Sequence, residues 1–336
     1  SPEDRSKIVR VAATPDVPDE ISEYTLLIVN QARVIDYFAE YALRGPARIN
    51  VNYGYEFLDL TVHDSGEYPV EVRVKDPSGA ERTVRTKYAV GCDGGRSKVR
   101  DAIDVKVSFD PAAQAWAVMY ILADSDFPDF RSRGGIQSDK DGSILLIPRE
   151  GGFLTRFYVS LDSPNDKNRD RIFATTPAEA IERANRILNP YSADVKDVAW
   201  FSIYEVRHTV AEAFDNVASS SDPNRHPRVF LGGDATHTHS AKAGQGMNVS
   251  MQDTFNLGWK LGAVLHGQAI PDLLHTYAAE RQVTAQELID YDIHWSKMVG
   301  SRDAADPVTP AEVQEQFVRG GKFTAGFATR YTPEFS

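Results

Sequence analysis

Two apolar strands in this chain each run into a glycine-rich turn that leads to a helix, and this feature constrains the fold most. In the first, the stretch YAV leads to Asp93-Gly94-Gly95, and a short helix is predicted to begin near Ser97. In the second, the stretch RVFL leads to Gly-Gly-Asp234, and Gly244-Gln245-Gly246 then opens a long helix. Glycines let a ligand approach the backbone closely, and a helix N-terminus offers free N–H groups to an anion. The pattern predicts a mixed α/β fold with two candidate ligand-binding turns.

The first turn also has a purely structural interpretation, namely a strand–turn–helix corner capped by Ser97. In the second turn, the Asp234 carboxylate is suited to accept hydrogen bonds from sugar hydroxyls. The helix that begins at Gly244 has a positive end suited to a negative charge on a ring or a phosphate. Taken separately, neither turn decides between a structural and a functional role.

Composition excludes several classes of protein. The 336 residues suggest roughly two domains at about 150 residues each. The net charge of −11, from 37 basic and 48 acidic residues, argues against general nucleic-acid binding. No apolar run is long enough to span a membrane, and the polar N-terminus predicts no signal peptide. A single cysteine, Cys92, excludes a disulfide framework and fits a cytoplasmic protein.

Hydrophobic periodicity gives a coarse map of the elements. Helices are predicted at Gln31–Leu43, at 176–188 with Thr176 as the cap, over about 243–267, and from Pro271 towards His294. An antiparallel meander is predicted from residue 49 to Cys92-Asp93-Gly94, and mostly strands over 106–215. In the long helix the candidate core residues are Val249, Phe255, Trp259, Ala263 and Leu265.

The two turns together form a more specific pattern. D-G-G-R-S-x-V-R at 93–100, followed by G-D-A-x-H-x-x-x-x-x-x-G-Q-G-x-N at 233–248, resembles the FAD-dependent aromatic hydroxylases of the para-hydroxybenzoate hydroxylase type. Supporting stretches are VNQARVIDYFAE at 29–40 and IPREGGFLTRFYVSL at 147–161. The chain is more similar to the phenol 2-monooxygenase and 3-hydroxybenzoate hydroxylase branch than to the rest of that family.

The resemblance implies a division into domains. Residues 1–105 and 216–300 would form a partial, Rossmann-like FAD-binding domain, residues 106–215 a sheet-rich substrate domain, and residues 301–336 a linker or tail. The family's G-x-G-x-x-G segment, which holds the ADP half of FAD, has no counterpart here. The thioredoxin-like C-terminal domain of the phenol hydroxylase branch is also missing from this sequence.

The resemblance also assigns candidate roles residue by residue. Gln31 would contact the flavin, Asp93 would lie near the pyrophosphate and the NADPH path, and Asp234 would hold the ribityl chain. The helix start beside the isoalloxazine would comprise Gly244, Gln245, Gly246, Met247 and Asn248. Arg156 and Tyr158, two apart on one face of a strand, are the candidate catalytic pair near the flavin and the substrate phenol.

The activity implied by the resemblance is hydroxylation of a phenolic ring in aromatic compound catabolism. NADPH or NADH reduces the flavin, and O₂ adds to give a C4a-hydroperoxide that delivers oxygen to the ring. A homodimer is the family's expected state. Two alternatives stay open: a non-catalytic fragment that does not retain FAD, and a metal-dependent hydrolase using Asp234, His237 and His239. The resemblance accounts for these three residues without a metal.

Overall fold

A computed structural model describes most of the chain. The described residues are 7–11, 13, 21–138, 140–149, 151–162, 164–165, 167–217, 225–240, 244–300 and 310–331. Helices and strands are mixed, which confirms the predicted α/β character. The chain forms two compact units. Unit 1 comprises Ser1–Asp36, Pro111–Arg207 and Lys297–Gly321, and unit 2 comprises Tyr37–Asp110, His208–Ser296 and Lys322–Ser336.

Unit 1 is built on a sheet with the strand order β9-β5-β8-β7-β6, in which β5, β8, β7 and β6 pair antiparallel. The strands are β5 (Val107–Ser125), β6 (Gly134–Ser138), β7 (Gly142–Pro148), β8 (Leu154–Ser160) and β9 (Ala193–Ala211). The helices are α3 (Arg169–Phe173), α4 (Pro177–Leu188) and α7 (Pro310–Arg319). The short strand β6 lies within the region 106–215 that the sequence predicted to be mostly strand.

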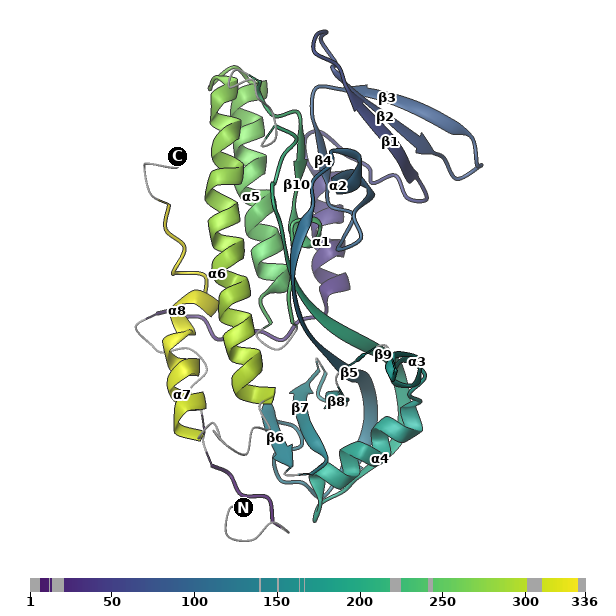
Figure 1. Cartoon of the computed structure of the whole chain (residues 1–336), viewed down its shortest axis with the longest axis vertical. Helices are drawn as coiled ribbons and strands as arrows, with labels where there is room; N and C mark the ends of the chain where they lie inside the picture. Colours follow the sequence, from purple (N-terminus) through teal and green to yellow (C-terminus); the bar gives the residue numbers. More distant parts are fainter. Residues whose placement is uncertain are drawn as a thin grey trace. The chain divides into compact units, whose positions relative to one another are not determined.

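Helix α4 covers one face of this sheet, as Figure 1 shows. It begins as predicted, because Thr176 caps it in a full capping box with Glu179, and Pro177 fills its first position. Alternate residues of β8 point to opposite faces of the sheet. Phe157 and Val159 therefore pack in the core cluster that includes α4, while Tyr158 packs in a different cluster.

Unit 2 contains a three-stranded meander and a separate parallel pair of strands. The meander consists of β1 (Glu56–Val62), β2 (Val70–Lys75) and β3 (Glu81–Thr86). The predicted continuation to Cys92-Asp93-Gly94 is wrong, and so is the predicted start at residue 49. The next strand, β4 (Ala89–Gly91), leaves the meander and pairs in parallel with β10 (Val229–Leu231). This long-range pairing is invisible to local alternation, because its partner lies far along the chain.

Short elements follow each strand of the parallel pair. After β4 comes α2 (Lys98–Ala102), and after β10 come η1 (Gly233–Ala235), β11 (His237–Thr238) and α5 (Gly246–Leu265). The remaining elements are η2 (Pro271–Leu274), α6 (His275–Gly300), α8 (Gly321–Thr324) and α1 (Gln31–Arg44), which starts where the sequence predicted. At Gly91, a Cβ atom would lie 2.7 Å from Cβ of Val99, so glycine permits α2 to pack closely on β4.

Helices α5 and α6 lie side by side (Figure 1) and are joined by buried polar contacts. Val249 is buried as predicted, whereas Phe255, Trp259 and Leu265 are exposed, so their assignment to the core is wrong. The buried face of α5 instead carries Val249, Asp253, Asn256, Leu257 and Lys260. Three of these five are polar, and hydrophobicity alone therefore selected the wrong face.

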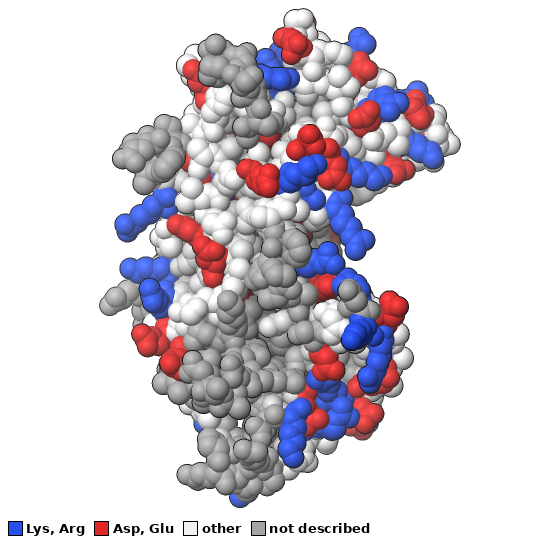
Figure 2. All heavy atoms as spheres, in the orientation of Figure 1, with Lys and Arg blue, Asp and Glu red and all other residues white. Residues whose placement is uncertain are grey.

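Acidic and basic side chains are interspersed over the meander and over α4 on the face drawn in Figure 2. The excess of acidic residues therefore does not form a single negatively charged patch on that face. Within the described residues, no helix combines the length and the apolar character needed to cross a bilayer.

Candidate functional site

The parallel pairing of β4 and β10 brings the two glycine-rich turns together within unit 2. The turns leave the carboxyl ends of these neighbouring strands, and the Gly232 N–H donates to the Gly91 carbonyl oxygen at 3.0 Å. Arg100 joins the turns directly, because its guanidinium donates to the carbonyl oxygens of Gly95 and Ala235, both at 3.0 Å. Ligands of open α/β sheets bind at this edge, outside the carboxyl ends of the strands.

Asp93 has a structural role at the first turn. One carboxylate oxygen accepts a hydrogen bond from the Ser97 hydroxyl, and the other accepts from the Val99 N–H at 3.1 Å. Ser97 is the N-cap of α2, and its hydroxyl oxygen accepts from the Arg100 N–H at 2.9 Å. The structural interpretation of this corner is confirmed. Asp93 can therefore shape the turn while its side chain stays committed to α2.

Asp234 differs from Asp93 in having an uncommitted side chain. It is exposed on η1, and it forms no hydrogen bond or ion pair with any described residue. The preceding Gly233 has a φ of +63°, and a Cβ atom there would lie 3.3 Å from Cβ of Ser250. Glycine thus allows the chain to turn tightly against α5 and to present the Asp234 carboxylate outward.

The N-terminus of α5 follows the second turn. Gly244 has a φ of +68°, Gln245 is the N-cap without a side-chain capping bond, and the first turn contains no acidic residue. Gln245 instead donates from Nε2 to the Thr324 carbonyl oxygen at 3.1 Å, and Asn248 donates from Nδ2 to the Gly244 carbonyl oxygen at 3.1 Å. Met247 is half-buried. The first N–H groups of this 20-residue helix lack a side-chain cap, and its positive end suits an anionic group.

These features of unit 2 fit a flavin. The open helix start offers donors and a positive dipole to an electron-rich ring, and the free Asp234 carboxylate is an acceptor for chain hydroxyls. Gly94 and Gly244 have positive φ values, and a Cβ atom at either would meet nothing within 4 Å. The conformation of these turns, rather than a lack of space, therefore requires glycine at both positions.

A buried carboxylate, Asp253, anchors the second turn and is not among the site residues predicted from the sequence. Its Oδ2 accepts from His237 Nε2 at 2.8 Å and from the Gly233 N–H at 3.2 Å, and its Oδ1 accepts from Arg281 Nε at 2.7 Å. Asp253 is fully buried and Arg281 is 1% exposed. The sequence carries no local signal for this role, because Asp253 is one of three polar residues on the buried face of α5.

A second buried carboxylate, Asp292 on α6, anchors the segment after β11. It accepts from His208 Nε2 at 2.8 Å, from the Ser240 N–H at 2.6 Å and from the Ser240 hydroxyl at 2.6 Å. Burial alone would raise the pKa of Asp292, but the hydrogen bonds from His208 and Ser240 outweigh it and lower that pKa.

The lowered pKa of Asp292 predicts that part of the free energy of unfolding is lost at acidic pH. Because the folded pKa lies below the unfolded value of about 3.9, the contribution is fully present above that pH. It is lost as the pH falls through the folded pKa. Urea unfolding at neutral pH and at several pH values below about 4 should therefore show a smaller acid loss for Asp292→Asn than for the unaltered protein. The exposed Asp290→Asn is the control, and an equal acid loss in all three proteins would contradict the prediction.

The alternative of a metal site at Asp234, His237 and His239 is unsupported. His237 Nε2 is bound to Asp253, and His239 Nδ1 lies 2.8 Å from the Ser240 carbonyl oxygen. Burial lowers the pKa of His239, which favours its neutral ring. The described part of the chain contains no group of three or more His, Cys, Asp or Glu residues placed to hold a metal ion.

The candidate catalytic pair lies on β8 in unit 1. Arg156 and Tyr158 share one face of the strand, as predicted, and the guanidinium donates to the Tyr158 hydroxyl oxygen at 3.1 Å. Tyr158 packs with Trp116, Val118 and Val206 in a small apolar cluster. The pair therefore combines a cation and a phenol on a largely apolar sheet face.

Gln31 occupies the predicted position at the start of a helix. It is the first residue of α1 and is exposed, and the preceding Asn30 caps the helix through a bond from the Ala32 N–H at 3.0 Å. The structure thus brings Asp93, Asp234 and residues 244–248 into unit 2, whereas Gln31, Arg156 and Tyr158 belong to unit 1.

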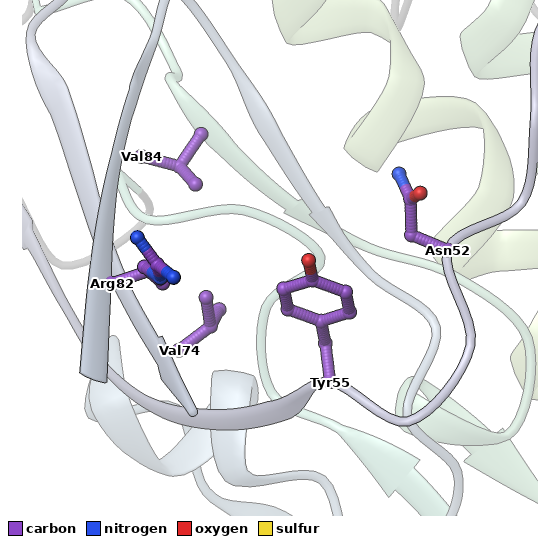
Figure 3. A pocket seen from close by; sticks show the side chains of 5 residues that line it. All are labelled: Asn52, Tyr55, Val74, Arg82 and Val84. Atoms are coloured by element: carbon purple, nitrogen blue, oxygen red, sulfur yellow. The ribbon is translucent and has the colours of Figure 1, made fainter. Parts of the chain in front are cut away.

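A separate hollow lies on the meander, and different residues line it. Figure 3 shows Val74, Arg82 and Val84 of β2 and β3 facing Asn52 and Tyr55 of the preceding segment. None of the candidate site residues lines it.

Comparison with known proteins finds a matching family model and related enzymes. A family model described as an FAD binding domain matches residues 9–292. The 3-hydroxybenzoate 4-monooxygenase of Comamonas testosteroni is 45% identical over 342 residues, covering 99% of this chain and 53% of that enzyme. A phenol 2-monooxygenase of Aspergillus fumigatus is 34% identical, covering 96% of this chain and 52% of that enzyme. This chain spans about half the length of the curated relatives it matches.

Solved structures show the same fold. CabE, an aromatic hydroxylase from angucycline biosynthesis, superposes with a TM-score of 0.72 and 27% identity, covering 94% of this chain and 61% of CabE. The OxyS anhydrotetracycline hydroxylase of Streptomyces rimosus gives a TM-score of 0.71 at 24% identity, covering 91% of this chain and 58% of OxyS. Together with the match over residues 9–292, these similarities show that the chain belongs to the FAD-binding domain family of flavin-dependent aromatic hydroxylases.

Proposed function

We propose that the protein binds FAD at the carboxyl-end turns of β4 and β10 and hydroxylates a phenolic ring with NADPH or NADH and O₂. The observation that carries this proposal is the junction of the two glycine-rich turns through Arg100, beside the uncapped start of α5. The family match covers all these residues. The alternatives of a non-catalytic fragment and a metal-dependent hydrolase gain no support from the comparisons.

In this proposal the flavin is held by the residues that the sequence resemblance assigns to it. The Asp234 carboxylate accepts hydrogen bonds from the ribityl hydroxyls, and the N–H groups at Gly244–Asn248 stabilise negative charge on the ring. Asp93 shapes the turn near the pyrophosphate, and Gln31 contacts the flavin. Bound FAD supplies the redox chemistry, accepting a hydride from the nicotinamide and activating O₂.

Unit 1 residues bind the aromatic substrate in the same proposal. The Tyr158 hydroxyl donates to the phenolic oxygen, and the Arg156 guanidinium favours its anionic form, which activates the ring towards an electrophile. The surrounding apolar side chains, including Trp116 and Val118, exclude water from the reacting ring. The two relatives named above act on 3-hydroxybenzoate and phenol by their names, so a simple phenol is the proposed substrate class.

The proposal retains the domain division predicted from the sequence. Residues 1–105 and 216–300 form the FAD-binding part, residues 106–215 bind the substrate, and residues 301–336 form a linker or tail. A cytoplasmic location and a homodimeric state are further parts of the proposal.

Retention of flavin tests the proposal directly. The purified chain is incubated with FAD or with FMN, passed through a gel-filtration column, and examined for visible flavin absorbance that co-elutes with protein. We expect FAD to co-elute and NAD(P)H oxidation to rise when phenol or 3-hydroxybenzoate is added. Protein that is folded by circular dichroism but colourless after either incubation would contradict the proposed site. The FMN sample shows how much of the binding depends on the ADP half.

A further inference from the structure

A second tyrosine, Tyr120, lies beside the candidate catalytic pair in unit 1. It belongs to β5, directly opposite Arg156 of β8 in the antiparallel register, and Val118 of β5 is opposite Tyr158. The Arg156 guanidinium donates to the hydroxyl oxygens of both tyrosines, at 3.1 Å to Tyr158 and through a short bond to Tyr120. One cation therefore joins two phenol groups on the same sheet face.

The chemistry of these hydrogen bonds leaves two donors available. A guanidinium has N–H donors and no acceptor, so each tyrosine oxygen accepts from Arg156 and keeps its own O–H proton for another partner. Within the described residues, neither Tyr120 nor Tyr158 donates its proton to an acceptor. An oxygen atom that carries negative charge is the ligand group that such a pair of O–H donors recognises best.

The charges around Tyr120 favour an anionic oxygen as well. The guanidinium carbon of Arg156 lies 4.6 Å from the centre of the Tyr120 ring, and that of Arg149 lies 4.9 Å from it. Arg156 forms no ion pair with a described carboxylate, and its Nε is shielded from solvent without an acceptor. Its positive charge is therefore not neutralised by the described residues, and an anion placed here would be stabilised.

An aromatic surface adjoins the same group. The ring of Trp200 on β9 lies 5.0 Å from the Tyr120 ring, at an angle of 37°, and 46% of Trp200 is exposed. Aromatic rings stack favourably in offset or tilted arrangements, so an exposed indole beside two phenol donors suits a ligand that is itself aromatic. Charge, donors and aromatic surface therefore point to one ligand class, a phenolate.

We propose that Tyr120 is a substrate-binding residue, which donates with Tyr158 to one phenolate oxygen while Arg156 holds both hydroxyls in place. This inference rests on the proposed function, because the phenol is the proposed substrate. It assigns to Tyr120 a role equal to that of Tyr158 in favouring ionisation of the bound phenol. Trp200 contributes the wall against which the ring stacks.

The test uses 4-nitrophenol, whose ionisation changes its colour, and the full chain incubated with FAD. Tyr120→Phe removes the O–H donor and keeps the ring against Arg156 and Trp200. We expect about 10- to 100-fold weaker binding by equilibrium dialysis, as for loss of a hydrogen bond to a charged group. We also expect a smaller ionised fraction of the bound 4-nitrophenol at a fixed pH. A structural role alone would leave that ionised fraction unchanged.

Two further variants make the outcome decisive. Tyr158→Phe should act in the same direction, whereas Tyr191→Phe, which alters a tyrosine packed on Phe127, should leave binding unchanged. Normal binding and ionisation in Tyr120→Phe, with weakened binding in Tyr158→Phe, would overturn the inference and leave the proposed function standing. Normal phenol binding in both variants would place the phenol elsewhere and overturn it too. An unaltered protein that retains neither FAD nor 4-nitrophenol would overturn both proposals.

Discussion

Replacing Asp253 with alanine is expected to lower the free energy of unfolding by about 3–5 kcal/mol, the usual cost of breaking a buried ion pair. Asp253 is fully buried and bonds to Arg281, His237 and the Gly233 N–H. Burial alone would lower the pKa of Arg281, but the Asp253 carboxylate more than restores it. Without that carboxylate, the Arg281 charge stays buried beside a turn that has lost its anchor.

Urea unfolding followed by circular dichroism measures this effect. Asp290→Ala, an exposed carboxylate on α6, is the matched control and should change stability by no more than about 0.5 kcal/mol. The double variant Asp253→Ala with Arg281→Met should lose less free energy of unfolding than Asp253→Ala alone. It removes the Arg281 charge together with its partner, so no unpaired charge stays buried. A loss below about 1 kcal/mol in Asp253→Ala would show that the network is not a stabilising anchor.

Replacing Asp234 with alanine is expected to weaken FAD binding about 10- to 100-fold while leaving stability almost unchanged. The carboxylate is exposed and forms no hydrogen bond or ion pair with a described residue. Its removal should therefore change the free energy of unfolding of the apo protein very little. The proposed bonds to the ribityl hydroxyls are charge-assisted, and losing one costs about 1.5–3 kcal/mol of binding free energy. The separation of binding from stability is what distinguishes Asp234 from Asp253.

Flavin fluorescence titration gives the dissociation constants, and urea unfolding of the apo protein gives the stability. Asp64→Ala is the control, since Asp64 is a 96% exposed carboxylate in unit 2 and its removal changes the net charge equally. The FAD affinity of Asp234→Asn should lie between those of Asp234→Ala and the unaltered protein, because the amide oxygen of asparagine still accepts a hydrogen bond. Equal FAD affinity in the unaltered protein and Asp234→Ala would remove Asp234 from the proposed flavin site.

Local features of the fold were readable from the sequence. The helix at Gln31 and the capped helix at Thr176 begin as predicted, because capping and periodicity depend on residues within one turn of each other. The Ser97 corner was also readable, since its cap lies next to the glycines. The sequence predicted the strands of the meander but not its end. The end was missed because β4 pairs with β10, which lies far along the chain, instead of with β3.

The residues that stabilise the candidate flavin site could not be predicted from local sequence patterns. Asp253 and Asp292 carry no local signature. Their roles follow from the contact of Asp253 with Arg281 between α5 and α6, and from the contact of Asp292 with His208 between α6 and β9. The buried face of α5 carries Asp253, whereas Phe255, which was expected in the core, is exposed. Tyr120 was also missed, because only the antiparallel register of β5 and β8 sets it opposite Arg156.

The sequence by itself determined the family, the two glycine turns and the residue types able to meet a flavin, because these depend on short motifs whose chemistry is local. The tertiary structure decided which carboxylates serve the fold and which stay free for a ligand. Asp93 and Asp234 look alike in sequence, yet Asp93 accepts hydrogen bonds from Ser97 and Val99 at the start of α2, whereas Asp234 has an uncommitted side chain. That difference arises from hydrogen bonds and burial, which exist only once distant segments are packed together.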